Sequence, residues 1–436
     1  MKDKVIKKPV ISVVGGIEQG KTSLIESLWE GVSADKSTNG VLSYSIREDI
    51  PGRGEMDYQV KELDSVVYSL QKNWFKKESN LKELALSDVI LFLVPASSFG
   101  YKQEIAFLRE LIKSQYYHNQ HIVICLSKAD YLIIDDDCKN IKLKSITRLM
   151  QINNTLFEAF EKHLKRECFS CDSIIPVSVP LKWNYDVLKE KLWEGIIERV
   201  NETTFDNNAA TVVIAGKRGC GKSTTLNELW GLDLPTNKAV ACTKYPMVLR
   251  VPMMIGNSTV FINLVDLPGI AESLDADMQY TAFYEKYIDK ASVLICLSQA
   301  DTRAYKQDEL FYNSLMESKI LTKDTQLILG INQIDLLFKT KETPDGINLN
   351  MTSVDDPLIQ GKIDDYYGNV YSKIFAHMPN VSRADVCAYS ALFRWNINSL
   401  KRMLQNKLML NNKNNQLCQL QIYSDLEERK QKSIWL

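Results

Sequence analysis

The feature that most constrains the fold of this chain is an internal duplication. Three segments of the first half return in the same order in the second half, at offsets that grow from 201 to 212 residues. The pairs are GKTSLIESLW (20–29) with GKSTTLNELW (221–230), Ala96 and YKQE (101–104) with Ala300 and YKQD (305–308), and KWNYDVLK (182–189) with RWNINSLK (394–401). A slowly growing offset is expected when two copies of one unit differ by a few loop insertions. The sequence therefore predicts two related domains in tandem.

Length and composition agree with two folded domains. The chain has 436 residues, which suits two domains of about 200 residues each. Hydrophobic residues make up 45% of the chain and charged residues 25%, as in ordinary globular proteins. We expect a first domain at 1–200, a linker at 201–210, a second domain at 211–410 and a helical tail at 411–436.

Charge, cysteine content and hydropathy favour a cytoplasmic protein. The net charge of −1 gives no global attraction to nucleic acid or to acidic lipid. The nine cysteines show no regular framework, which is typical of a reducing compartment. The N-terminal MKDKVIKKPV lacks the apolar run of a secretory signal, and no stretch approaches the roughly 18 apolar residues that a membrane span needs.

Within each copy, short apolar runs alternate with helical patterns. This alternation predicts an α/β fold in which a mostly parallel sheet is flanked by helices. The expected strands are 10–14, 89–94, 121–126 and 174–179 in the first copy, and 211–215, 260–266, 293–298 and 326–332 in the second. Helical spacing is shown by Ile152, Leu156, Phe160 and Leu164, and again by Tyr185, Leu188, Leu192 and Ile196.

Each copy contains a glycine-rich motif that is typical of phosphate binding. The two motifs are Gly15-x4-Gly20-Lys21-Thr22 and Gly216-x4-Gly221-Lys222-Ser223, each between an apolar run and a helical pattern. Glycines let the backbone curl so that its N–H groups face a β-phosphate, and the dipole of the following helix favours negative charge. The lysine reaches the β- and γ-phosphate oxygens, and the hydroxyl of Thr22 or Ser223 ligates Mg²⁺. We expect Ser23, Gly219, Cys220 and Thr224 to take part in the same two sites.

A second motif in each copy indicates guanine as the base. SKAD supplies Ser127, Lys128 and Asp130, and NQID supplies Asn332, Gln333 and Asp335. The terminal aspartate can accept hydrogen bonds from the ring N–H and the amino group of guanine, which adenine cannot offer. Both motifs follow an apolar run, and the carboxyl ends of such strands are where these sheets bind ligands. Further along, Ser178 and the pair Ser390 and Ala391 fall where another loop would support the base.

The second copy has the better set of residues for hydrolysis. DLPG matches the DxxG element, in which Asp266 would hold Mg²⁺ through water and the Gly269 N–H would contact the γ-phosphate. Thr243 lies 21 residues after Lys222 and is expected to close on Mg²⁺ when the γ-phosphate is present. Ile270 cannot orient water as a glutamine would, so turnover should be slow unless a group such as Arg303 or a partner domain intervenes.

The first copy departs from this pattern. By its offset, Asp64 is expected opposite Asp266, but SVV follows it and the glycine contact is missing. Thr38 and Ser43 are both candidates for the switch hydroxyl, and neither lies at the repeat offset. We therefore expect the first site to bind nucleotide and to hydrolyse it poorly.

With these residues in view, the second copy resembles bacterial GTPases related to Era and to the interferon-inducible, immunity-related GTPases. The motifs that carry this resemblance over residues 206–410 are GKRGCGKSTTLNELWG, ACTKYP, DLPGIAES, SQADTRAYKQDELFY and NQID. The resemblance implies a Ras-like P-loop GTPase domain with GTP, GDP and Mg²⁺ as ligands. It also implies the roles given above for Lys222, Ser223, Thr243, Asp266 and Asp335. The first copy resembles the wider Era-like group through its P-loop and SKAD only.

The resemblance leaves several modes of action open. The tandem arrangement is similar to that of the Der ribosome-assembly GTPases, which makes an assembly factor bound to ribosome or RNA the first alternative. A dynamin-like or immunity-related machine that self-assembles, with or without a membrane, is the second, and a scaffold without turnover is the third. Because such relatives pair across their nucleotides, the two copies are also expected to pair within one chain or in a homo-oligomer.

Overall fold

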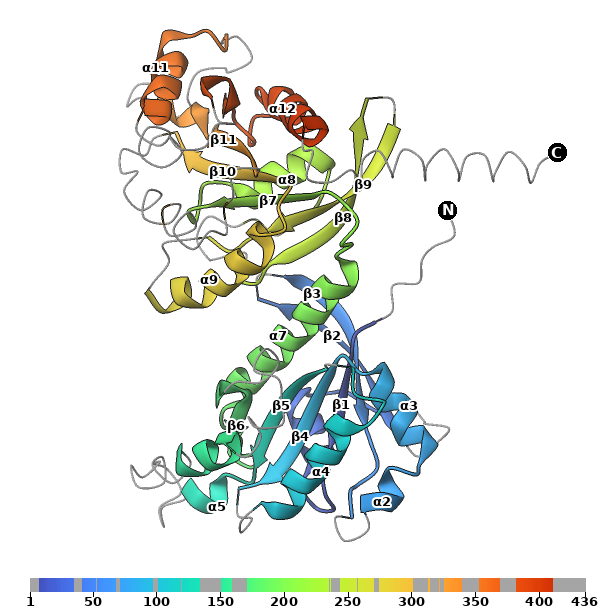
Figure 1. Cartoon of the computed structure of the whole chain (residues 1–436). Helices are drawn as coiled ribbons and strands as arrows, with labels where there is room; N and C mark the ends of the chain where they lie inside the picture. The colour runs from blue at the N-terminus through green and yellow to red at the C-terminus, as the bar shows by residue number, and fades with distance from the viewer. Residues whose placement is uncertain are drawn as a thin grey trace, which may run out of the picture. The chain divides into compact units, whose positions relative to one another are not determined.

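The computed structural model of the chain describes two compact units. The residues described are 8–34, 41–51, 53–67, 71–96, 101–118, 120–133, 150–158, 171–234, 236, 244–256, 258–269, 274–300, 313, 321, 325–338, 353–368 and 382–410. Unit 1 comprises residues 1–50 and 55–202, and unit 2 comprises 51–54 and 203–436. Each unit is described by itself below (Figure 1). The predicted tail at 411–436 lies outside the described residues.

Unit 1 contains a six-stranded sheet in the order β2-β3-β1-β4-β5-β6. The strands are β1 (Val10–Val14), β2 (Leu42–Ile50), β3 (Gly54–Glu62), β4 (Val89–Pro95), β5 (His121–Ser127) and β6 (Ile174–Pro176). The helices are α1 (Lys21–Leu28), α2 (Gln71–Trp74), α3 (Glu78–Leu86), α4 (Lys102–Lys113), α5 (Asp130–Ile133) and α7 (Tyr185–Thr204), and Cys171–Ser173 form a 3₁₀ turn. Strand β1 pairs in parallel with both β3 and β4.

Unit 2 repeats this arrangement, with the order β8-β9-β7-β10-β11-β12. Its strands are β7 (Thr211–Gly216), β8 (Met247–Ile255), β9 (Ser258–Asp266), β10 (Val293–Gln299), β11 (Gln326–Asn332) and β12 (Val386–Ala388). Its helices are α8 (Lys222–Trp230), α9 (Leu274–Ile288), α11 (Pro357–Tyr366) and α12 (Ile397–Leu410), with 3₁₀ turns at Ile334–Phe338 and Arg383–Asp385. The β8–β9 pair is antiparallel, whereas β7 lies parallel to β9 and to β10. The shared strand order supports the predicted duplication.

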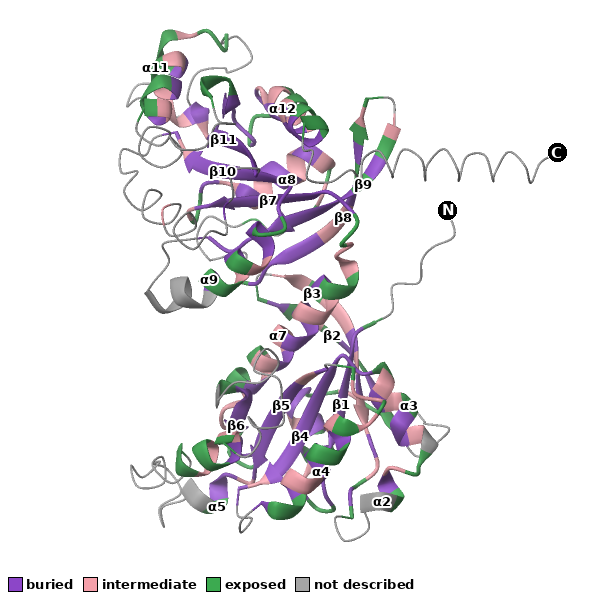
Figure 2. Ribbon diagram, viewed as in Figure 1, coloured by how far each residue is buried: buried purple, intermediate pink, exposed green. Residues whose placement is uncertain are grey.

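Both faces of the central strands of each sheet are buried, which explains their uninterrupted apolar runs. In unit 1, Phe92 packs on one face with Phe107 of α4, while Leu91 packs on the other with Leu24 of α1 and Leu192 of α7. In unit 2, helices α9 and α11 cover one face and helices α8 and α12 cover the other. The buried strands between exposed helix faces are visible in Figure 2. The predicted α/β fold with flanking helices is therefore confirmed.

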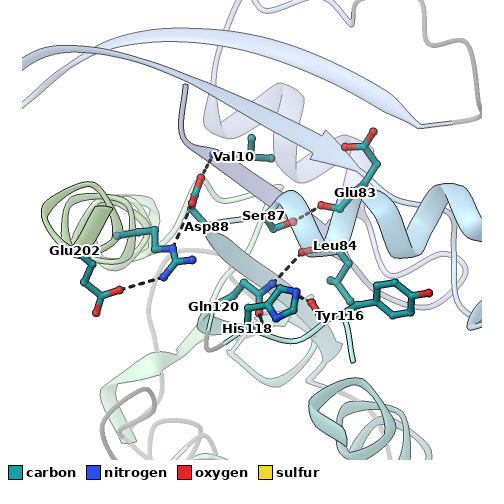
Figure 3. Close-up of polar contacts among 10 residues, drawn as sticks. Val10, Glu83, Leu84, Ser87, Asp88, Tyr116, His118, Gln120 and Glu202 are labelled. Carbon is teal, nitrogen blue, oxygen red and sulfur yellow. Dashed lines mark hydrogen bonds and ion pairs between the residues drawn. The ribbon is translucent and has the colours of Figure 1, made fainter. Parts of the chain in front are cut away.

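The amino ends of the unit 1 strands are closed by structural polar contacts (Figure 3). Asp88 accepts from the backbone N–H of Val10 at 2.9 Å and lies 3.6 Å from Arg199 of α7. The buried Gln120 side chain donates to the carbonyl oxygens of Leu84 and Tyr116. Because these groups satisfy one another, this edge is a structural support. The carboxyl ends of the strands, which carry the predicted motifs, form the opposite edge.

Two features differ from expectation at the level of elements. Helix α7 continues to Thr204, so the first residues of the predicted linker are helical. Strands β2, β3, β8 and β12 were not among the predicted strands. Among the described residues, no helix combines the length and the apolar character that crossing a membrane requires.

Candidate functional site

In unit 2, the predicted P-loop connects β7 to α8 at the centre of the sheet. Gly219 and Gly221 have φ angles of 79° and 87°, a conformation that favours glycine. The side chain of Lys222 is buried, and its Nζ donates to the carbonyl oxygens of Gly216 at 3.0 Å and Lys217 at 3.2 Å. The loop thus ends at the N-terminus of α8 with its lysine folded over it, an arrangement suited to phosphate.

Two of the three predicted metal ligands of unit 2 lie together. Ser223 on α8 donates from its Oγ to Oδ2 of Asp266 at 2.6 Å, and Asp266 is buried at the end of β9. A hydroxyl and a carboxylate are the hard oxygen ligands that Mg²⁺ prefers. This donor set therefore fits Mg²⁺ beside the P-loop. Thr243, the predicted switch residue, lies outside the described residues, as do Ile270 and Arg303.

Gly269 lies against the P-loop, and its lack of a side chain is required there. A Cβ at this position would stand 2.8 Å from both the backbone N and the Cα of Arg218. Such a contact with backbone cannot be relieved by a change of rotamer. The preceding carbonyl, that of Pro268, accepts a hydrogen bond from Tyr284 of α9. The DLPG segment is therefore held directly beside the loop that would contact phosphate.

At the base end of unit 2, Asn332 connects two loops. Its Nδ2 donates to the carbonyl of Cys220 at 2.9 Å, and its Oδ1 accepts from the backbone N–H of Ala391 at 3.0 Å. Gln333 has a φ of 63° and donates from Nε2 to the carbonyl of Gly219 at 2.7 Å. Asn332 and Gln333 therefore fasten the base loop to the P-loop.

The predicted guanine acceptor of unit 2 is also held in place. Asp335 is buried, and its Oδ1 accepts a hydrogen bond of 2.7 Å from Oγ of Ser390. Tyr389, the residue before Ser390, lies 2.9 Å through its hydroxyl from Oγ1 of Thr225 on α8. The structure thus brings the P-loop, the NQID motif and the Ser390–Ala391 loop together at one edge of the sheet. Thr224 lies next to Ser223 in the first turn of α8.

Unit 1 has a P-loop of the same shape with different contacts. Glu18 and Gly20 have φ angles of 58° and 84°, matching Gly219 and Gly221. Lys21 is buried, and its Nζ donates to Oγ of Ser65 at 2.7 Å and more weakly to the carbonyl oxygen of Gly15 at 3.5 Å. Burial lowers the pKa of the Lys21 ammonium, although the nearby carboxylates of Glu62 and Asp64 oppose that shift.

A second difference concerns the metal position of unit 1. Thr22 donates from Oγ1 to the carboxylate of Glu62, at 2.8 Å and 3.0 Å from its two oxygens. Ser23, the next residue of α1, is exposed. Thr22 and Glu62 repeat the hydroxyl–carboxylate pair of unit 2 with a longer acidic side chain.

The strand register corrects the predicted alignment of the two copies. In unit 1, Val13 of β1 pairs with Glu62 of β3, and in unit 2, Ile214 of β7 pairs with Asp266 of β9. Val13 and Ile214 each stand two residues before the first glycine of their P-loops. The counterpart of Asp266 is therefore Glu62, and the expectation that it is Asp64 is wrong.

The corrected alignment changes which residues of unit 1 matter. The segment ELDS (62–65) corresponds to DLPG (266–269), so Ser65 replaces Gly269. Asp64 instead forms an ion pair of 2.8 Å with Lys77. Glu62 and Ser65 were missed, although the offset of 204 shown by Ala96 and Ala300 would have aligned them. Ser43, a candidate switch residue, lies within β2, and Thr38 lies outside the described residues.

The base end of unit 1 keeps its shape but lacks the connecting asparagine. Lys128 has a φ of 59°, close to that of Gln333. Ser127 and Asp130 are buried, and neither Oγ of Ser127 nor Oδ1 of Asp130 has a hydrogen-bond partner among the described residues. Ser178 forms an antiparallel β-bridge with Trp183 through the backbone, as Ser390 does with Trp395. A serine is too short to reach the P-loop as Asn332 does, so this loop is fastened less firmly. Gly15 lies at the start of this P-loop, against the side chain of Gln19.

Part of the second unit is similar in sequence to known proteins. Residues 211–333 match the family described as "50S ribosome-binding GTPase". Two curated Escherichia coli (strain K12) proteins, "Uncharacterized protein YkfA" and "Uncharacterized protein YfjP", are each 35% identical to this chain, over 124 and 128 residues. The matches cover 28% and 29% of this chain and 41% and 42% of those proteins. This chain thus spans less than half the length of these relatives.

Solved structures are similar at lower identity. A structure of Era from Aquifex aeolicus bound to GDP·AlF4⁻ is 19% identical, with a TM-score of 0.33, over 45% of this chain and 56% of that chain. A probable GTP-binding protein engB is 16% identical, with a TM-score of 0.31, over 46% of this chain and 99% of that chain. The family match over residues 211–333 includes the P-loop, the DLPG segment and the start of NQID. The match to this GTPase family therefore lies within the second unit, over its P-loop and the loops beside it.

Proposed function

We propose that this chain binds GTP with Mg²⁺ and hydrolyses it to GDP and phosphate mainly in unit 2, with unit 1 acting as a regulatory or weakly active nucleotide site. The observation that carries the proposal is the contrast between Ser223–Asp266 with Gly269 in unit 2 and Thr22–Glu62 with Ser65 in unit 1. Of the two units, only unit 2 has a glycine at this position against the P-loop, and the N–H of this glycine could contact a γ-phosphate.

Each residue of unit 2 has a physical role in this proposal. The ammonium of Lys222 donates to the carbonyl oxygens of Gly216 and Lys217 in this structure. With nucleotide bound, it would donate to the β- and γ-phosphate oxygens instead. Ser223 and Asp266 would hold Mg²⁺, which neutralises charge that develops on the phosphates. Asp335 would accept from guanine while Ser390 holds its other side. Thr243 and Gly269 would order around the γ-phosphate and be released when it leaves.

The proposal is tested by GTP turnover of the full chain with Mg²⁺ and after removal of Mg²⁺ by a chelator. We expect Asp266→Asn to lower turnover by roughly a hundredfold or more, because it removes the charge that holds the metal. Asp64→Asn is the matched control, since Asp64 pairs with Lys77 in unit 1. Turnover that is insensitive both to the chelator and to Asp266→Asn would refute the proposal.

A second candidate function is suggested by the family description, which names the large ribosomal subunit. In this alternative the output is binding to a ribosomal subunit, and slow hydrolysis only times release. Co-sedimentation of the chain with purified subunits in the presence of a GTP analogue, repeated with GDP, tests it. Binding that depends on the γ-phosphate and weakens with salt would favour this function, whereas no sedimentation with either nucleotide would exclude it.

A further inference from the structure

The site of unit 1 contains a hydroxyl group where unit 2 has a glycine. Ser65 replaces Gly269, and its Oγ lies 2.7 Å from Nζ of Lys21. In a P-loop this ammonium is the group that reaches the β- and γ-phosphate oxygens. The Ser65 hydroxyl therefore contacts the lysine as a phosphate oxygen would.

The segment that carries Ser65 is fixed to the P-loop. The backbone N–H of Val66 donates to the carbonyl of Gly15 at 2.9 Å, and Val66 forms a parallel bridge with Gly16. The side chains of Leu63 and Val66 are each only 1% exposed. Moving Ser65 away to admit a γ-phosphate would break this backbone hydrogen bond and expose Val66.

The charge around this P-loop also opposes the most negative nucleotides. The four residues after the first glycine are GIEQ in unit 1 and KRGC in unit 2, so this segment carries one acidic residue in unit 1 and two basic residues in unit 2. A cavity of about 530 Å³ beside the unit 1 loop is lined by Glu18, Glu104 and Lys128, among others. The carboxylates of Glu18 and Glu104 have the same sign of charge as a phosphate and therefore disfavour an additional phosphate in this pocket.

The base end of the same site is nevertheless ready for a guanine. Asp130 is 8% exposed, and its buried Oδ1 has no hydrogen-bond partner among the described residues. A buried carboxylate oxygen without a partner is costly, and the ring N–H and amino group of guanine would satisfy it. The Lys128 backbone has the same left-handed conformation as Gln333 in unit 2.

We infer that the nucleotide site of unit 1 is selective for guanosine diphosphate over guanosine triphosphate, because the Ser65 hydroxyl takes the place of the γ-phosphate on Lys21. The inference rests on the proposed function, in which unit 1 is a nucleotide site. It adds that this site responds to the product of the reaction in unit 2 rather than to its substrate.

The test is a binding titration on the full chain with unit 2 silenced by Lys222→Ala and Asp335→Ala together. Fluorescent GDP and a fluorescent non-hydrolysable GTP analogue are titrated with Mg²⁺ present. We expect GDP to bind at least roughly tenfold more tightly than the analogue. The γ-phosphate of the analogue would lose its charge-assisted contact with Lys21 to Ser65 and would be repelled by the nearby carboxylates. In the same background, Ser65→Gly should strengthen binding of the analogue and bring the two affinities close together. Ser65→Thr, which keeps the hydroxyl, is the matched control and should keep the preference for GDP.

Equal affinities in the parent protein, or a preference that Ser65→Gly leaves unchanged, would overturn the inference. Failure of unit 1 to bind either nucleotide would also overturn it. None of these results changes the GTP turnover that the proposed function assigns to unit 2 through Lys222 and Asp266. Only the failure of unit 1 to bind either nucleotide would also remove the nucleotide-site role proposed for unit 1. Conversely, a chain without GTP turnover that still shows the Ser65-dependent preference for GDP would refute the proposed function and leave this inference standing.

Discussion

At the scale of single residues, one side chain accounts for much of the difference between the two base loops. Asn332 connects β11 both to the P-loop and to the loop at Ala391, whereas Ser127 at the same place in unit 1 has no partner for its hydroxyl among the described residues. Both of the groups that Asn332 satisfies belong to the backbone. Removing it would leave a buried N–H and a buried C=O unsatisfied, which is more costly than the loss of two exposed contacts.

The first prediction follows from this connection. Asn332→Ser, which copies unit 1, should weaken GDP binding at unit 2 by about ten- to a hundredfold, because each lost bond contributes about 1 kcal/mol. Titration of GDP and thermal unfolding without nucleotide both measure the effect. Ser127→Ala is the matched control and should leave thermal unfolding unchanged. If Asn332→Ser binds GDP as tightly as the parent protein, the connection has no role in binding.

The second prediction concerns Gly269. Gly269→Ala places a methyl group 2.8 Å from the backbone of Arg218, so the DLPG segment or the P-loop has to shift. We expect a loss of about 1–3 kcal/mol in the free energy of unfolding of unit 2, together with lower GTP turnover. Gly361→Ala in α11 is the control, since a Cβ there meets no atom within 4 Å and alanine favours the helix. Equal stability and turnover in the two variants would contradict the close packing at Gly269.

At the scale of elements, the sequence predicted the strands that are buried on both faces and missed those with a polar face. Strands β2 and β3 carry LSYSIREDI and GEMDYQVKE, whose charged residues interrupt any apolar run. Strand β12 has only three residues, too few for a periodic signal. The error at Asp64 comes from the offset that was applied, because the offset of 204 at Ala96 and Ala300 pairs Glu62 with Asp266, as the strand register does.

The β2 strand is fastened to α7 by a polar cluster around Glu48. Its carboxylate accepts hydrogen bonds from Lys189 at 2.5 Å, Tyr58 at 2.6 Å and Trp193 at 3.1 Å. Burial opposes the ionisation of Glu48, but the hydrogen bonds from these three residues outweigh it and lower its pKa below the usual 4.5. An ionised Glu48 therefore stabilises unit 1.

The third prediction tests this cluster. Glu48→Gln should lower the free energy of unfolding of unit 1 by about 1–2 kcal/mol at neutral pH, after allowance for partial exposure to solvent. Because the folded-state pKa is lowered, the stabilisation is present above the ordinary carboxyl pKa and is lost as the pH falls through the lowered value. Denaturant unfolding at stepwise lower pH measures this, with the exposed Glu55→Gln as control. A difference between parent and Glu48→Gln that is the same at every pH would contradict the assigned role.

At the scale of the whole molecule, two sheets of the same strand order agree with the duplication predicted from three repeated segments. The P-loops, the base motifs and DLPG all lie where the sequence placed them, because short motifs with fixed local geometry can be read from sequence. The contacts of Lys21 with Ser65 and of Thr22 with Glu62 could not be predicted in this way. They join residues 40 or more positions apart, and only the fold brings such residues together.

The two copies are proposed to have different roles, with GTP hydrolysis in unit 2. The most direct measurement is GTP turnover of the full chain with Mg²⁺, compared with Lys21→Ala and Lys222→Ala. We predict that Lys222→Ala lowers turnover by roughly a hundredfold or more, while Lys21→Ala retains most of it. Equal loss of turnover in both variants would contradict the claim and show that the two units act as one catalytic machine.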